Sequence, residues 1–185
     1  HGVIIQRIHI QEEALTDRFI TRILKEPCFH EDPPVFVDIG ASGGISSEWS
    51  EFAPFSICLA CDADSRDFNP TAIEDKCTWL RSYACKALVA EQRAAEVPFF
   101  LTRSPSCSSS LSPDAEALAP WEFAPLFDVT SEVRLPALGI CDVLEKAGVS
   151  RIDWFKCDSQ GTDLRILKAL PRKTISDMLA IELEP

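Results

Sequence analysis

The stretch Val35-Phe36-Val37-Asp38-Ile39-Gly40-Ala41-Ser42-Gly43-Gly44 decides the fold of this chain. It passes from an apolar run through one acid into a turn that contains three glycines. Such a run is typical of a strand buried on both faces of a parallel sheet. Glycines directly after the strand permit a tight turn and a close approach of the backbone to a ligand. We therefore expect a central strand over residues 35–39 with a ligand site at its carboxyl end.

The spacing of the glycines argues against a dinucleotide-binding turn. In the pattern G-x-G-x-x-G the third glycine comes five positions after the first. Counted from Gly40, that position holds Ile45, and Ser42 replaces the middle glycine. Asp38 would repel a pyrophosphate and suits a ligand with positive charge. The stretch looks like motif I of the class I S-adenosylmethionine-dependent methyltransferases, whose cofactor carries an ammonium and a sulfonium but no phosphate.

Composition sets the broad class. A chain of 185 residues fits one domain with a real core. Its apolar fraction of 46% and charged fraction of 25% are those of a globular protein. No apolar run approaches the roughly 20 residues that span a bilayer, and no secretory signal is present. The net charge of −11 argues against a non-specific nucleic-acid binder. We expect a cytoplasmic protein without a membrane or nucleic-acid partner.

The chain has eight cysteines, whose even number permits disulfides. Cys58 and Cys61 are the only closely spaced pair, and along one strand their side chains point to opposite faces. No second pair follows at the spacing of a zinc site. Free cysteines in buried strands act as small apolar residues. The sequence therefore predicts reduced thiols and no metal site.

The order of apolar and polar residues predicts strands that alternate with helices. Further strands are expected at 55–60, 78–85, 97–101, 132–135, 152–157 and 178–183, and helices at 11–25, 45–52, 69–77, 139–147 and 164–170. A helix that prolines interrupt is expected over residues 114–127. The Ser/Pro-rich residues 104–113 predict either an exposed loop or a lid over a substrate.

These elements predict an α/β fold, Rossmann-like, with a mainly parallel sheet and helices on both faces. Residues 1–33 are interpreted as a helical lead-in and residues 34–185 as the ligand-binding domain. Asp62 ends the second strand about 20 residues after Gly40, the position from which an acid accepts both ribose hydroxyls. The alternative is a solvated turn acid, because Asp64 and Asp67 lie nearby.

With these elements placed, the chain resembles the FkbM family of methyltransferases. The resemblance rests on five blocks in a shared order: Phe36–Ala41, Ser108–Leu111, Leu138–Leu144, Phe155–Lys168 and Ile181-Glu182. Two departures are mild, since the family usually has Glu in place of Asp62 and an aliphatic residue in place of Cys157. The family's sheet also continues into an antiparallel hairpin after the fifth main strand. The chain is therefore interpreted as truncated there.

The resemblance implies an enzyme of class EC 2.1.1.- that uses S-adenosyl-L-methionine to methylate a hydroxyl of a small molecule or sugar. The cofactor-binding residues it implies are Asp38, Gly40, Ala41, Ser42, Gly44, Asp62, Ala63, Ala87 and Leu88. Asp158 is the candidate beside the transferred methyl. Lys156 lies on the same strand face and is expected to hold Asp158 ionised. Ser109, Gln160 and Asp163 are expected to contact the substrate.

Three alternatives stay open from the sequence. Asp158, Asp163, Glu182 and Glu184 fall at adjacent strand ends, where they either bind Mg²⁺ or Ca²⁺ or are simply solvated, and solvation is the favoured interpretation. A nicotinamide oxidoreductase with an unusual turn is a second possible function. A binding module that kept the methyltransferase fold without catalysis is a third.

Overall fold

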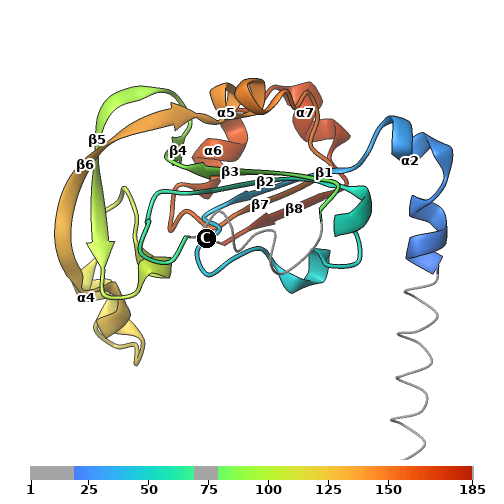
Figure 1. The fold of residues 1–185 in the computed structure, drawn as a ribbon. Coiled ribbons are helices and arrows are strands. Elements are labelled where there is room, and N and C mark those ends of the chain that lie inside the picture. The colour runs from blue at the N-terminus through green and yellow to red at the C-terminus, as the bar shows by residue number, and fades with distance from the viewer. Residues whose placement is uncertain (1–18, 69–78, 185) are drawn as a thin grey trace, which may run out of the picture.

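The computed structural model describes residues 19–68 and 79–184 (Figure 1). The strands are β1 (Val35–Ile39), β2 (Ile57–Asp62), β3 (Arg81–Lys86), β4 (Leu88–Ala90), β5 (Ala94–Thr102), β6 (Val129–Gly139), β7 (Trp154–Cys157) and β8 (Ala180–Leu183). The α-helices are α2 (Pro27–Glu31), α4 (Ala115–Leu118), α5 (Ile140–Ala147), α6 (Asp163–Ala169) and α7 (Arg172–Asp177). The 3₁₀ helices are η1 (Ser47–Trp49), η2 (Ala53–Phe55), η3 (Pro105–Cys107) and η4 (Ala124–Phe127).

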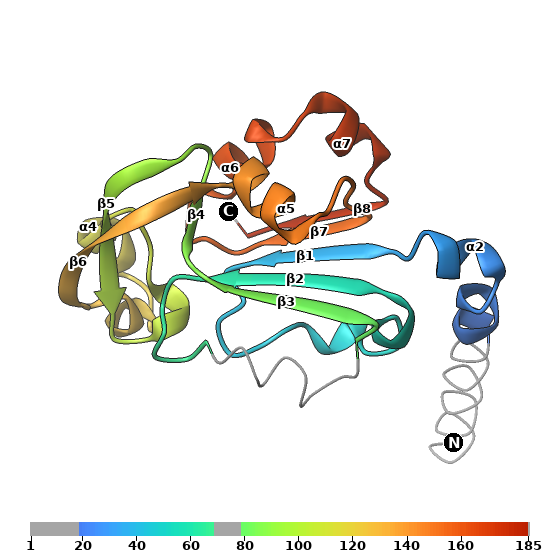
Figure 2. The same ribbon diagram turned by 45° about the horizontal axis from the view of Figure 1, so that its top comes forward.

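The main sheet of the described chain has five strands in the order β3-β2-β1-β7-β8, and every neighbouring pair is parallel (Figure 2). All five residues of β1 are buried, as expected for a central strand. The chain moves outward from β1 to β3 and later returns to the other side of β1 as β7. The strand order therefore reverses between β1 and β7, and open α/β sheets bind ligands at the carboxyl ends beside such a reversal.

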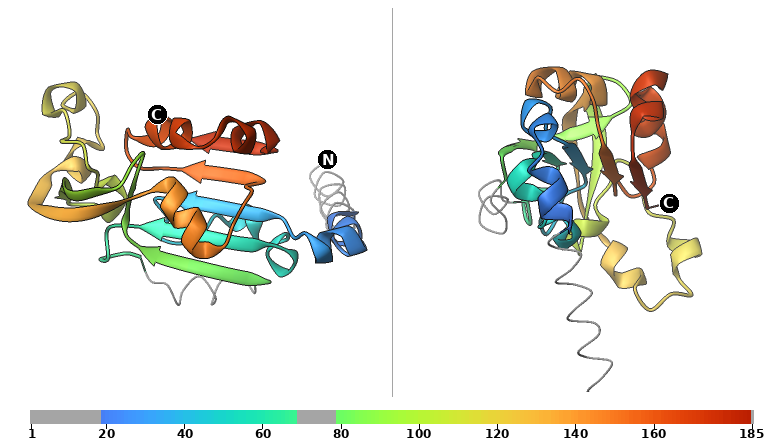
Figure 3. Two further views of the ribbon diagram at one scale, coloured as in Figure 1. Left: turned by 90° about the horizontal axis from the view of Figure 1, so that it is seen from above. Right: turned by 90° about the vertical axis from the view of Figure 1, so that its right-hand side faces the viewer.

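Alternate residues of β1 face two different core layers. Val37 packs into a layer that includes residues of α5 and α6, whereas Phe36 packs against Trp49, Trp79 and Trp154 on the opposite face. Helices α5, α6 and α7 lie on one side of the sheet, and the chain through η1 and η2 passes along the other (Figures 1 and 3). The fold is thus α/β with helices packed against a parallel sheet.

Local sequence explains why α5 begins and ends where it does. Ile140, Val143 and Leu144 recur at helical spacing and are buried. At the start of the helix, the side chain of Asp142 accepts the backbone N–H of Gly139 at 3.2 Å. Gly148 ends the helix in a left-handed conformation with φ +67°. The prediction of a helix that Gly148 terminates is confirmed.

A second sheet of three strands, β4-β6-β5, lies beyond the carboxyl ends of the main strands (Figures 1 and 2). The sequence predicted only a short strand at 132–135, whereas β6 has 11 residues. Pro136 lies inside β6 and lacks a backbone N–H. The pairing of β5 with β6 shifts between Ala94 and Val97, opposite this proline, and this irregularity lets the strand continue.

The prediction of an α-helix at 45–52 is wrong. The chain forms η1 and η2 there, with backbone bonds from Phe52 to the carbonyl of Trp49 and from Phe55 to that of Phe52. Of these two turns, η1 lies within residues 45–52 and carries the fully buried Trp49, and η2 follows them.

Other predicted boundaries differ by a few residues, and α2, α7 and β4 were not predicted. The broken helix at 114–127 corresponds to α4 and η4. The expected helix at 69–77 and residues 11–18 of the first helix lie outside the described residues, whereas residues 19–24 are helical. None of the helices in the described part of the chain has the length and apolar character needed to cross a bilayer.

Candidate functional site

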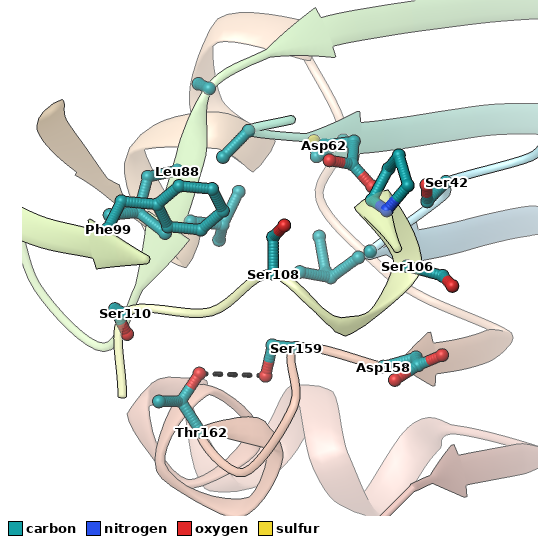
Figure 4. Close-up of a pocket in the computed structure, with 17 residues that line it drawn as sticks. Ser42, Asp62, Leu88, Phe99, Ser106, Ser108, Ser110, Asp158, Ser159 and Thr162 are labelled. Carbon is teal, nitrogen blue, oxygen red and sulfur yellow. Dashed lines mark hydrogen bonds between the residues drawn. The ribbon is translucent and has the colours of Figure 1, made fainter. Parts of the chain in front are cut away.

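A cleft lies where the carboxyl ends of β1, β2 and β7 meet β4, β5 and the serine segment, which we define as residues 104–111 (Figure 4). The predicted site residues that line it are Gly40, Ser42, Asp62, Ala63, Ala87, Leu88 and Asp158. The predicted residues that do not line it are Asp38, Ala41, Gly44, Lys156, Ser109, Gln160 and Asp163. Its volume is about 40 Å³. Ligand pockets usually measure about 300–1,000 Å³, so the cleft is narrow in this conformation.

Gly40 brings two strand ends together. Its φ is +83°, and a Cβ added to it would lie 1.9 Å from the carbonyl oxygen of Asp158. The backbone N–H groups of Gly40 and Ala41 donate to the carbonyl of Cys61 at 2.8 and 3.1 Å. Gly40 also lines the cleft, so the expectation of a ligand at this turn stays a prediction. The missing side chain admits the end of β7, and both amides are already bonded within the protein.

Asp62 faces the cleft beside Ser42 (Figure 4). Asp62 is only 9% exposed, and its Oδ1 accepts the N–H of Asp64 at 2.7 Å. Burial raises the pKa of this carboxyl to about 6, although backbone amides of Asp64 and Ser42 oppose the shift. A buried carboxylate at a strand end is an acceptor for the hydroxyl groups of a ligand. The sequence placed this residue by its position, and the structure brings it into the cleft.

Leu88 and Phe99 supply an apolar wall to the same cleft (Figure 4). Both are buried, and they belong to a cluster that also contains Ala137. Leu88 was expected beside an adenine, but Phe99 was not singled out by the sequence. The second sheet carries Phe99 to this position, and that pairing is not visible in local sequence patterns.

Asp38 and Lys156 form an ion pair beneath the cleft, with Nζ 3.3 Å from Oδ1. Asp38 is fully buried, and its Oδ2 has no hydrogen-bond partner. Burial raises the pKa of Asp38 to about 6 against the opposing effect of Lys156. Burial acts to lower the pKa of Lys156, but Asp38 and two further acids raise it overall. This ion pair therefore keeps the lysine charged and leaves the carboxylate poorly solvated.

Asp158 lines both the cleft and a neighbouring hollow of about 340 Å³ along β7 and β8. Burial, and then the hydrogen bond and charge of Glu184, raise the pKa of Asp158 to about 7. Gln160 Nε2 donates to Asp158 Oδ1 at 2.5 Å and opposes that shift. The charge of Lys156 lowers the pKa of Asp158, as expected, but it does not outweigh burial and Glu184, and the ion pair of its Nζ is with Asp38 on the adjacent strand β1.

Two residues expected to contact substrate form hydrogen bonds that hold the loop after β7. Asp163 is buried and accepts the N–H groups of Ser159 and Gly161, each at 3.1 Å. Ser109 Oγ donates to the carbonyls of Ser159 and Gln160 at 3.1 and 2.9 Å. Gln160 adopts a φ of +56°, which is uncommon for a residue with a side chain. Ser109 and Asp163 thus have structural partners.

The serine segment separates the cleft from a second cavity of about 290 Å³. Ser106, Ser108 and Ser110 line the cleft, whereas Cys107, Ser109 and Leu111 line the second cavity. After the 3₁₀ helix η3, the chain from Ser108 onward is extended, so alternate side chains there point to opposite sides. The segment is consequently a partition with two lined faces, which favours the predicted role as a lid or substrate edge over an exposed loop.

A charged network that the sequence did not predict ties this segment to β2. Asp64 is only 1% exposed and pairs with Arg66 at 2.5 Å. Ser108 Oγ donates to Asp64 at 2.8 Å, and Arg66 donates to the carbonyl of Thr102 at 2.8 Å. Burial acts to raise the pKa of Asp64, but the bonds from Arg66 and Ser108 lower it overall. The available signal was the spacing Asp-x-Arg directly after a buried strand.

Of the four acids at the strand ends, Asp158 and Glu184 interact with each other, whereas Glu182 and Asp163 have partners of their own. Glu182 accepts the indole N–H of Trp154 at 2.5 Å, and Asp163 serves the loop described above. Within residues 19–68 and 79–184, no group of three or more His, Cys, Asp or Glu side chains is placed to hold a metal ion. Comparisons of the chain with protein-family models, curated proteins and solved structures found no match.

Proposed function

We propose that the chain is an S-adenosylmethionine-dependent methyltransferase that acts on a hydroxyl of a small molecule or sugar. The observation that carries the proposal is the placement of Asp62 at the carboxyl end of β2, facing a cleft whose other wall is Leu88 and Phe99. A carboxylate opposite an apolar wall suits a nucleoside, since ribose offers two hydroxyls and adenine a flat apolar face. The cleft also lies beside the reversal in strand order between β1 and β7.

The fit to the cofactor is better for its nucleoside half than for its methionine half. Asp38 does not line the cleft, and the amides of Gly40 and Ala41 are bonded to Cys61. Because the cleft measures about 40 Å³, the serine segment must move outward before a nucleoside can enter. Ser108 and Arg66, which attach this segment to Asp64, would control that movement.

Asp158 is the residue best placed for a role in the chemistry. S-adenosylmethionine, when bound, supplies a methyl group on a sulfonium. A hydroxyl nucleophile must be held in line with that group and must lose a proton. Asp158 lines both the cleft and the hollow along β7 and β8, so it lies between a cofactor in one and an acceptor in the other. Its pKa of about 7 suits proton transfer near neutral pH.

The test is calorimetric titration of the chain with S-adenosylhomocysteine. We expect saturable binding that Asp62→Ala weakens by more than about tenfold, through loss of the ribose acceptor. Asp177→Asn is the matched control, because Asp177 is exposed and pairs with Lys173 away from the cleft. Absence of binding by the unmodified chain, with its fold verified by circular dichroism, would contradict the proposal.

Of the two other candidate functions, the non-catalytic binding module keeps support from two observations. The narrow cleft and the bonded glycine amides fit a chain that holds a ligand without turnover. Binding of S-adenosylhomocysteine without methylation of any offered acceptor would select it. A nicotinamide oxidoreductase is disfavoured, because a pyrophosphate needs free amides at a helix N-terminus and the turn leads instead into the 3₁₀ helix η1.

A further inference from the structure

We propose that Cys61 and Cys85 are an oxidisable dithiol site, which a peroxide converts into a disulfide between β2 and β3. The two residues lie directly opposite each other in the parallel register of these strands. Neighbouring strands lie about 4.8 Å apart, within the Cα separations of about 4.4–6.8 Å that disulfides span. Both thiols are free, and both belong to the core layer on the α5 side of the sheet. The proposal does not depend on methyltransferase activity.

The two thiols have different environments, which assigns them different roles. Cys61 is fully buried, whereas Cys85 is half-buried. Hydrogen bonding with Cys61 and, to a smaller extent, the charge of Lys146 on α5 lower the pKa of Cys85 to about 6, against the effect of burial. The same bond, burial, and the charges of Asp38 and Cys58 raise the pKa of Cys61. Cys85 is therefore the attacking thiolate, and Cys61 is the thiol that resolves the product.

The chemistry balances with hydrogen peroxide as the oxidant. The Cys85 thiolate attacks one peroxide oxygen, the O–O bond breaks, and the departing hydroxide takes a solvent proton to become water. Cys85 is then a sulfenic acid. The Cys61 sulfur attacks the Cys85 sulfur, the S–O bond breaks, and the leaving hydroxide takes the Cys61 proton. One peroxide is reduced to two waters while two thiols are oxidised to one disulfide.

The site is joined to the cleft through the backbone. The carbonyl of Cys61 accepts the N–H groups of Gly40 and Ala41, and Asp62 is the next residue. Ala87, two residues after Cys85, donates its N–H to the carbonyl of Asp62 at 3.0 Å. A disulfide would therefore fix β3 to the strand end that carries Asp62. Oxidation of this pair should therefore change the mobility of the cleft wall that carries Asp62, whatever ligand the cleft holds.

The experiment treats the folded, reduced chain with hydrogen peroxide, blocks the remaining thiols with an alkylating agent and maps peptides by mass spectrometry. We expect a Cys61–Cys85 cross-linked peptide that has lost two hydrogens. In Cys61→Ser, Cys85 should stop at the sulfenic acid, which a 1,3-diketone traps. In Cys85→Ser, oxidation of Cys61 should slow by more than about tenfold, because the reactive thiolate is gone.

Cys141→Ser is the matched control, since Cys141 is exposed and lies on α5, outside the pair. It should form the Cys61–Cys85 cross-link at the rate of the unmodified chain. Circular dichroism verifies that each variant is folded. The proposal is overturned if the folded chain forms no cross-link between these residues, or if Cys85 gains no sulfenic acid in Cys61→Ser. Either result can be obtained whether or not the chain binds S-adenosylhomocysteine.

Discussion

At the scale of single residues, the absence of a side chain at Gly40 determines how β1 and β7 end. The carbonyl of Asp158 occupies the space that a Cβ would fill, and the N–H of Asp158 donates to the carbonyl of Ile39 at 2.8 Å. The ends of two neighbouring strands are therefore locked together, and Asp158 is held at the border of the cleft. Gly40 resembles part of a ligand-binding turn, but the close packing of β1 against the end of β7 is what requires a glycine at this position.

Gly40→Ala should consequently destabilise the fold by about 3–5 kcal/mol, through left-handed strain and a clash with rigid backbone. Gly148→Ala is the matched control. Gly148 also has a positive φ of +67°, but an added Cβ would meet nothing within 4 Å, so only the strain of about 1–2 kcal/mol remains. Urea unfolding measures both free energies. Equal losses for the two variants would contradict the packing role of Gly40.

The buried carboxyl of Asp38 should make the stability of the fold depend on pH. Its pKa rises from 3.8 to about 6 in the folded state, mainly through burial, so the native chain holds this proton more tightly than the unfolded chain. Its contribution to stability is therefore present at low pH and is lost as pH rises from about 4 to about 6. A shift of this size corresponds to about 3 kcal/mol.

The measurement is the free energy of unfolding in urea across that pH range. Asp62 and Asp158 titrate in or near the same range, so the slope of the unmodified chain is a sum. Asp38→Asn should reduce the slope of the unfolding free energy against pH by the part that Asp38 contributes, whereas Asp177→Asn should not change this slope. If the slopes of the unmodified chain and Asp38→Asn coincide, the carboxyl at this position has an ordinary pKa.

At the scale of elements, the serine segment is held by one isolated backbone bridge, between Ser109 and Phe100 of β5, and by side chains. Ser108 Oγ donates to Asp64 at 2.8 Å and accepts from Arg66 at 3.0 Å and from the N–H of Thr102 at 3.2 Å. One hydroxyl thus joins β2, β5 and the segment. Removing it leaves the buried Asp64 with one donor fewer, which costs about 1–2 kcal/mol.

Ser108→Ala should therefore open the segment more often. Hydrogen exchange followed by mass spectrometry should show amides of residues 103–111 exchanging about tenfold faster, while β1 stays protected. Ser106→Ala is the matched control, because Ser106 is exposed and its hydroxyl bonds to that of Ser104 at 2.8 Å and not to Asp64. Faster exchange in both variants would show that the segment opens independently of Asp64.

Elements with a local signal were predictable from the sequence, and those set by distant pairing were not. β1 and α5 follow from an apolar run and from helical spacing before Gly148. β4 has three residues and exists because Leu88–Ala90 pairs with Ala137–Gly139, far along the chain. The stretch 45–52 holds a 3₁₀ helix with a buried Trp49, which the local helical pattern did not distinguish from an α-helix.

The same division applies to the candidate site. Asp62 was predictable, because its distance from the glycine turn fixes its place at a strand end. The partner of Lys156 was not, because side-chain alternation puts both Asp38 and Asp158 within its reach. Only the pairing of β7 with β1 shows that Asp38 lies directly beside it. The wall formed by Phe99 depends on the second sheet, which no local pattern predicted.

At the scale of the whole molecule, the main sheet joins two core layers of different composition. The layer on the α5 side is largely aliphatic, whereas the opposite layer is rich in aromatic rings. The ring of Phe36 is at the centre of the aromatic layer, with centroids 5.2 Å from Trp49, 5.7 Å from Phe52 and 5.8 Å from Trp154. Because β1 contributes to both layers, the two should unfold together.

Phe36→Ala tests this view of the molecule. It should cost about 3–5 kcal/mol, because a fully surrounded ring leaves a large cavity. Phe123→Ala is the control, since Phe123 is 46% exposed and should cost less than about 1 kcal/mol. Tryptophan fluorescence reports mainly the aromatic layer, which holds three of the four tryptophans (Trp49, Trp79 and Trp154), and far-UV circular dichroism reports the secondary structure of the whole chain. In a chain that unfolds as one unit, Phe36→Ala shifts both urea midpoints by the same amount. A fluorescence midpoint that falls while the dichroism midpoint stays would show that the layers are separable and that β1 does not couple them.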